Sequence, residues 1–72
     1  METNRNYDYY FIFGVTAHNR YFTVDDVDER SLDNEVMKMY DLINYFGGTV
    51  TVYGINIADD IVDIIPQEEK TF

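Results

Sequence analysis

The absence of cysteine from a chain of only 72 residues is the strongest constraint on how this protein can fold. A domain of this size buries only about 60% of the surface that its unfolded chain exposes. Without cysteine it can have neither disulfides nor a zinc site built on thiolates. Stability must therefore come from packing within one domain, helped by a dimer or a partner. At 46% hydrophobic residues, the chain is too apolar to be disordered.

The segment from Tyr7 to Ala17 is predicted to be a strand because apolar residues recur in it with a period of two. The more uniformly apolar alternate set is expected to face the core. Its members are Tyr7, Tyr9, Phe11, Phe13, Val15 and Ala17. Tyr10 and Ile12 are then expected on the outer face, and Gly14 is expected to mark a bulge or a close backbone approach.

A tight turn and a second strand are predicted to follow. His18 and Asn19 form a short polar break, and Asn tolerates the positive φ of hairpin turns. The segment from Arg20 to Asp25 then alternates, with Phe22 and Val24 directed inward and Tyr21 and Thr23 outward.

A helix is predicted from Ser31 to Phe46. Its apolar stripe has spacings of three and four, and consists of Leu32, Val36, Met39, Tyr40, Ile43 and Phe46. Ser31 is a suitable N-cap, and Asp28 is the alternative if the helix begins one turn earlier. Gly47 and Gly48 predict its end, since glycine readily takes the left-handed conformation that terminates helices.

Two further strands are predicted, from Thr49 to Ile57 and from Ile61 to Ile65. The result is a single α+β domain of order ββαββ, with a mostly antiparallel sheet, a structured core at 7–65 and frayed ends at 1–6 and 67–72. The helix stripe is expected to pack on Phe11, Phe13, Phe22, Val24, Val50 and Val52. The link from the second to the third strand can be a crossover that makes them parallel, or it can fold back.

No pattern for catalysis or for a bound cofactor is present in the sequence. His18 is the only histidine and Ser31 the only serine, and nothing places them together. An EF-hand loop starting at Asp26 fails at the positions that define it. Gly47 and Gly48 follow a helix, which is the reverse of a phosphate-binding loop. We therefore expect a protein that is not an enzyme and needs no metal or cofactor.

The charge balance predicts a basic partner. Fourteen acidic residues oppose five basic ones, which gives a net charge of −9. Such a charge repels nucleic acid and anionic lipid and speeds encounter with basic surfaces. It also exceeds slightly the magnitude of roughly 2–8 that keeps a small domain soluble, although solubility alone is the simpler explanation. The candidate partner-binding carboxylates are Asp25, Asp26, Asp28, Glu29, Asp59, Asp60 and Asp63.

Tyrosines on the outer faces of strands are the second group of candidate contact residues. Tyr10, Tyr21 and Tyr53 are expected there, and tyrosine is common at the centres of protein interfaces. They can anchor a partner, pack under a second layer, or form a homodimer interface.

In size, charge and element order, the whole chain resembles small acidic inhibitor proteins encoded by phages. These include anti-CRISPR proteins, inhibitors of uracil-DNA glycosylase and inhibitors of host RNA polymerase. Many such inhibitors resemble DNA in their charge distribution. The resemblance implies a viral protein in the cytoplasm of a host cell, whose partner is a host protein that handles nucleic acid or a CRISPR effector.

The leading functional prediction is therefore an inhibitor that binds and blocks a basic nucleic-acid-binding site, by mimicking DNA or by another mechanism. The alternative is a regulatory or structural module that dimerises through a tyrosine-rich sheet face. No membrane span or signal peptide is recognisable in the sequence, so the protein is predicted to be cytoplasmic.

Overall fold

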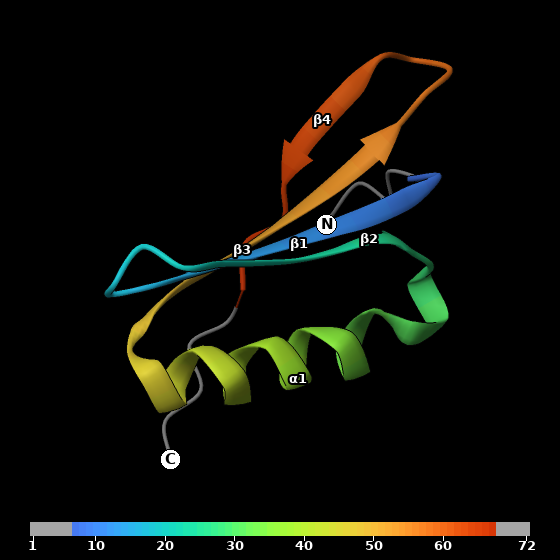
Figure 1. Cartoon of the computed structure of the whole chain (residues 1–72). Helices are drawn as coiled ribbons and strands as arrows, with labels where there is room; N and C mark the ends of the chain where they lie inside the picture. The colour runs from blue at the N-terminus through green and yellow to red at the C-terminus, as the bar shows by residue number, and fades with distance from the viewer. Residues whose placement is uncertain (1–6, 68–72) are drawn as a thin grey trace.

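A computed structural model describes residues 7–67, in which one antiparallel sheet carries one helix on one of its faces (Figure 1). The strands are β1 (Tyr9–Thr16), β2 (Tyr21–Val27), β3 (Gly48–Asn56) and β4 (Ile61–Ile64), and the helix is α1 (Glu29–Phe46). The α+β fold and the ββαββ order are thus confirmed. The segments predicted to be frayed lie outside the described residues, apart from Gln67.

The strand order in the sheet is β2-β1-β3-β4. Since β1 is antiparallel to both β2 and β3, these two strands run parallel to each other with β1 between them. The helix that joins them is therefore a crossover on one side of the sheet, which resolves the alternative left open by the sequence. A right-handed twist and one covered face are the usual result of such a unit.

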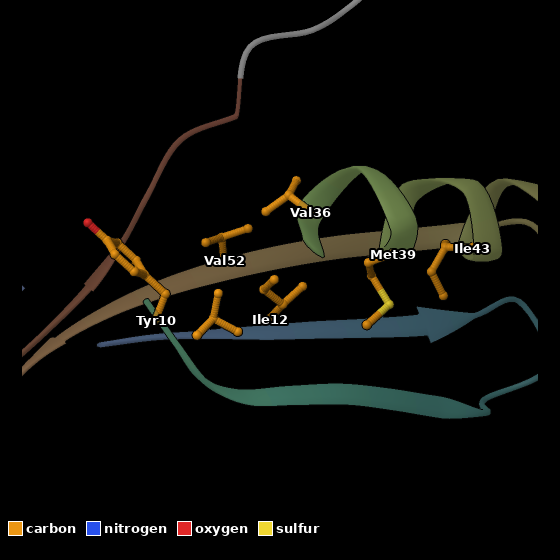
Figure 2. Close-up of a cluster of buried hydrophobic side chains, with 7 residues drawn as sticks. Tyr10, Ile12, Val36, Met39, Ile43 and Val52 are labelled. Carbon is orange, nitrogen blue, oxygen red and sulfur yellow. The ribbon is translucent and has the colours of Figure 1, made fainter. Parts of the chain in front are cut away.

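The helix covers the even-numbered side chains of β1. Tyr10 and Ile12 are 8% and 0% exposed, and they belong to the same buried cluster as Val36, Met39 and Ile43 of α1, with Tyr10 at the end away from Met39 and Ile43 (Figure 2). Val52 of β3 pairs with Ile12 and is equally buried. The prediction that Tyr10 and Ile12 lie on the outer face is therefore wrong.

Phe11 and Phe13, expected in the core, instead lie on the opposite face and are half-buried. The remaining four predicted helix contacts are on the helix side, as expected: Phe22, Val24, Val50 and Val52.

Gly14 explains why the less apolar side of β1 is the one that binds the helix. A Cβ atom at this position would lie 2.6 Å from the Met39 sulfur and 2.8 Å from Cγ1 of Ile43. The helix therefore approaches the sheet directly over Gly14, which is the close backbone approach that the sequence suggested. The odd-numbered set offers no such gap, because every member carries a side chain.

A second glycine on the same face accommodates an aromatic ring. Gly54 pairs with Tyr10, and a Cβ atom added to it would lie 2.8 Å from the ring of Tyr7. The Tyr7 ring in turn packs against Tyr10, with 5.6 Å between the ring centroids. Tyr7 thus closes the core beyond the reach of the helix.

The two ends of α1 follow from local chemistry. Asp28 is the N-cap, since its carboxylate accepts a hydrogen bond from the Ser31 N–H at 2.9 Å. The helix accordingly begins before Ser31, so the alternative cap is the correct one. At the other end, Gly47 has a φ of 82° and donates its N–H to the Ile43 carbonyl.

We predict that Gly14→Ala destabilises the fold by about 1–3 kcal/mol, because the new methyl group forces α1 away from the sheet. Urea unfolding followed by circular dichroism measures this loss. Asn44→Ala, at an exposed position of the same helix, is the control and should change stability by about 0.5 kcal/mol or less. An unchanged unfolding midpoint for Gly14→Ala would contradict the packing described.

Candidate functional site

The two acidic segments predicted from the sequence meet at one end of the sheet. Tyr10 near the start of β1 pairs with Val27 at the end of β2 and with Gly54 in β3, and Gly54 pairs with Asp63 in β4. The β2–α1 junction and the β3–β4 turn therefore lie at the same end, on opposite edges of the sheet (Figure 1). With strands about 4.8 Å apart, three spacings separate these edges by about 15 Å.

The acidic corner, defined here as Asp25, Asp26, Asp28 and Glu29, is built on an irregularity at the end of β2. The β1–β2 register shifts between the Tyr10 and Ile12 pairs, and Asp26 has a φ of 58°. The Asp25 carboxylate accepts the Asp26 N–H at 2.8 Å, which stabilises this bend. All four carboxylates are exposed.

The β3–β4 turn brings a second group of carboxylates to this end. Asp60 has a φ of 56°, and the Asp59 N–H bonds to the side chain of Asn56 at 2.9 Å. Both Asp59 and Asp60 are exposed. Asp8 joins them, since its carboxylate accepts the N–H of Ile57 at 2.6 Å. Asp8 was not among the contact residues predicted from the sequence, because only the strand pairing places it beside the turn.

Besides Asp25, which bonds only to the neighbouring Asp26 N–H, two of the predicted contact carboxylates have structural partners. Asp63 is half-buried on the helix side of the sheet, where it accepts a 2.7 Å hydrogen bond from the Tyr7 hydroxyl. Asp28 caps α1, and the backbone and side chain of Ser31 hydrogen-bond to it and lower its pKa below the usual value. Asp25, Asp26, Glu29, Asp59 and Asp60 are therefore better candidates for contact with a partner.

The open face is the side of the sheet that α1 does not cover. Its side chains alternate with those of the core and comprise Tyr9, Phe11, Phe13, Val15, Tyr21, Thr23, Thr49, Thr51, Tyr53, Ile55, Val62 and Ile64. None is charged. Two aromatic pairs cross it, Phe13 stacked on Tyr21 at 5.6 Å and Phe11 tilted against Tyr53 at 6.1 Å.

The three candidate tyrosines are placed differently. Tyr21 and Tyr53 lie on the open face as predicted, and Tyr21 is 64% exposed. Tyr10 lies in the core, where burial and then the nearby Glu29 carboxylate raise its pKa, so its hydroxyl stays protonated. It cannot serve as a surface anchor. Phe11 and Phe13 lie on the open face instead. Gly14, on the other side of β1, was the signal in the sequence that could have indicated this placement.

A shallow hollow of about 370 Å³ lies on the open face, lined by Phe11, Phe13, Tyr53, Ile55 and Val62. A second, of about 340 Å³, lies at the opposite end of the sheet from the acidic groups, lined by Thr16, His18, Arg20, Phe22 and Phe46. Within residues 7–67, no three potential ligand side chains are close enough to share a metal ion, and no helix could cross a membrane.

Comparison of the chain with protein-family models, with curated proteins and with solved structures found no match. The acidic end and the open face are therefore the features of the structure from which a function can be proposed.

We predict that Asp28→Ala lowers the urea midpoint of unfolding at neutral pH, because α1 loses its N-cap. Since the pKa of Asp28 is lowered by folding, its carboxylate stabilises the fold above the unfolded-state pKa. This contribution is lost as pH falls through the folded-state pKa, below 3.8.

Asp28→Asn is the matched variant, since Asn also caps helices but does not titrate. Its midpoint should stay closer to that of the wild type at neutral pH and should lack the acid-dependent loss from residue 28. Equal destabilisation by Ala and Asn would mean that the cap is not important for stability.

Proposed function

We propose that this protein is an inhibitory binding protein whose acidic end occupies a basic, nucleic-acid-binding site on another protein. The target class is a host protein that handles nucleic acid or a CRISPR effector complex, in keeping with the resemblance to small phage-encoded inhibitors. The observation that supports this most directly is the convergence of two acidic segments, distant in the sequence, at one end of a rigid sheet.

The charges at this end are available to a partner. Asp25, Asp26, Glu29, Asp59 and Asp60 are exposed and form no ion pair within residues 7–67. In that part of the chain, the ion pair present joins Lys38 to Glu35 on the helix, at 3.7 Å. Among residues 7–67, Arg30 is the cation next to the acidic corner, and its single charge offsets only part of the negative charge there.

A basic groove fits this arrangement better than other partners do. Sites that bind nucleic acid present Lys and Arg along the path of the phosphates, and much of their affinity comes from these charges. Carboxylates on the two edges of one sheet end can contact two points along such a path. Occupation of the groove would exclude nucleic acid, so inhibition follows from binding without any chemical step.

The decisive variant is Asp25→Lys with Glu29→Lys, two exposed positions of the acidic corner that do not cap the helix. The change raises the net charge by four, from −9 to −5. We expect an affinity pull-down from bacterial lysate to recover basic nucleic-acid-binding proteins with the wild type. Duplex DNA should compete with this capture, and the double variant should lose it by 10-fold or more, about 1.4 kcal/mol.

Met37→Lys with Asp41→Lys and Asn44→Lys is the matched control, since it makes the same change in net charge at exposed positions in later turns of the helix. This control should retain most of the capture. Equal loss in both variants would attribute binding to net charge alone, and full capture by the acidic-corner variant would refute the proposal.

A further inference from the structure

The open face is an apolar surface without a covering layer in residues 7–67. The molecule is only 17 Å thick along its shortest axis, which corresponds to one sheet and one helix. Tyr21, Val62 and Ile64 are each about two-thirds exposed on this face. Contiguous apolar surface of this kind usually marks an interface in a soluble domain.

The face has an exposed aromatic ring at one corner and a shallow hollow that reaches the diagonally opposite corner. Tyr21 pairs with Val15 on the outer strand β2, near the β1–β2 turn, and its ring stacks on Phe13. The hollow extends from Phe13 across Phe11 and Tyr53 to Ile55 and Val62. Val62 pairs with Ile55 on the other outer strand, β4, at the acidic end, so this end of the hollow lies diagonally across the sheet from Tyr21.

We propose that the open face binds a second copy of this chain, in a two-fold dimer in which Tyr21 of each copy enters the hollow beside Val62 of the other. A two-fold interface must be complementary to itself. An exposed ring and the Val62 end of the hollow, at opposite ends of one diagonal, meet this requirement, since a two-fold axis across the diagonal exchanges them. The two sheets then cross at a large angle, as in orthogonal sheet packing.

The charges next to these two corners also complement each other. Arg20 immediately precedes Tyr21, is exposed, and forms no ion pair within residues 7–67. Asp59 and Asp60 lie in the turn just before β4, close to Val62. A dimer that places Tyr21 of one copy beside Val62 of the other also places Arg20 beside Asp59 and Asp60 of that other copy. The two-fold axis repeats this contact, so it occurs twice in the dimer.

The size and chemistry of the face agree with a second copy. Four strands at about 4.8 Å spacing and about eight residues at about 3.3 Å give roughly 500 Å² of projected area. Accessible area exceeds this projection, so the face approaches the ~800 Å² per partner of a standard interface. Nucleic acid would need cations on this face, and none of its side chains is charged.

Sedimentation velocity over the micromolar range tests the proposal with purified protein. The wild type should dimerise with a Kd of about 1–100 μM, as expected for an interface of modest area. Tyr21→Ser should raise this Kd about 100-fold, because each dimer loses two anchoring side chains. Val62→Lys, on the other side of the same contact, should do likewise. Both positions are exposed in the monomer, and circular dichroism should confirm folding.

Tyr45→Ser is the matched control, since Tyr45 is 82% exposed but lies on α1, away from the open face. It should leave the Kd within about two-fold of the wild type. Charge exchange tests the orientation of the dimer. Arg20→Asp should weaken dimerisation, and adding Asp59→Arg to the same chain should restore it in part, since positions 20 and 59 again carry opposite charges while Asp60 keeps its negative charge.

A wild type that stays monomeric throughout this range would overturn the proposal and leave the open face to a different protein. A dimer that Tyr21→Ser and Val62→Lys do not weaken would place the interface elsewhere. Loss of dimer in those variants without rescue by the charge exchange would overturn the two-fold arrangement. None of these results depends on capture of a basic partner, so this proposal and the proposed function can fail separately.

Discussion

The contact between α1 and the glycine-containing side of β1 determines the rest of this structure. Met39 and Ile43 lie so close to Gly14 that a single added methyl group would overlap them. This seats the helix on Tyr10, Ile12 and their neighbours, and directs Phe11 and Phe13 to the opposite side. Because side chains alternate along a strand, the packing of α1 over Gly14 determines which set of aromatic residues lies on the open face and is available for binding.

The sequence predicted the elements well because their signals are local, such as the helix stripe and the Gly47 end, although it favoured Ser31 over Asp28 as the N-cap. It assigned the faces of β1 wrongly because both faces are apolar, and hydrophobicity alone favoured Phe11 and Phe13 for the core. The packing of α1 against Gly14 can be predicted only if the position of the helix is known, and no local sequence pattern contains that position. Likewise, the acidic residues were recognisable, but their meeting at one end depends on the order β2-β1-β3-β4. Asp8 and Asp63 acquired their roles only through that pairing.

The two proposed binding surfaces share Asp59 and Asp60. In the proposed dimer, these two residues lie opposite Arg20 of the other copy, whereas the acidic corner lies near the two-fold axis. The acidic corners of both copies then come to one side of the dimer and form a larger acidic surface. Their mutual repulsion opposes dimerisation, and a basic partner bound across both corners would relieve it. A basic partner that instead contacts Asp59 and Asp60 would compete with dimerisation.

The seating of the helix on the Gly14 side of β1 determines which residues form the open face, and nuclear Overhauser contacts test it most directly. We predict nuclear Overhauser contacts from the Ile12 methyl groups to Met39 and Ile43. We predict none from the rings of Phe11 or Phe13 to α1. Contacts from those two rings to the helix would contradict it. They would mean that the opposite side of β1 faces the helix, and the open face described here would not exist.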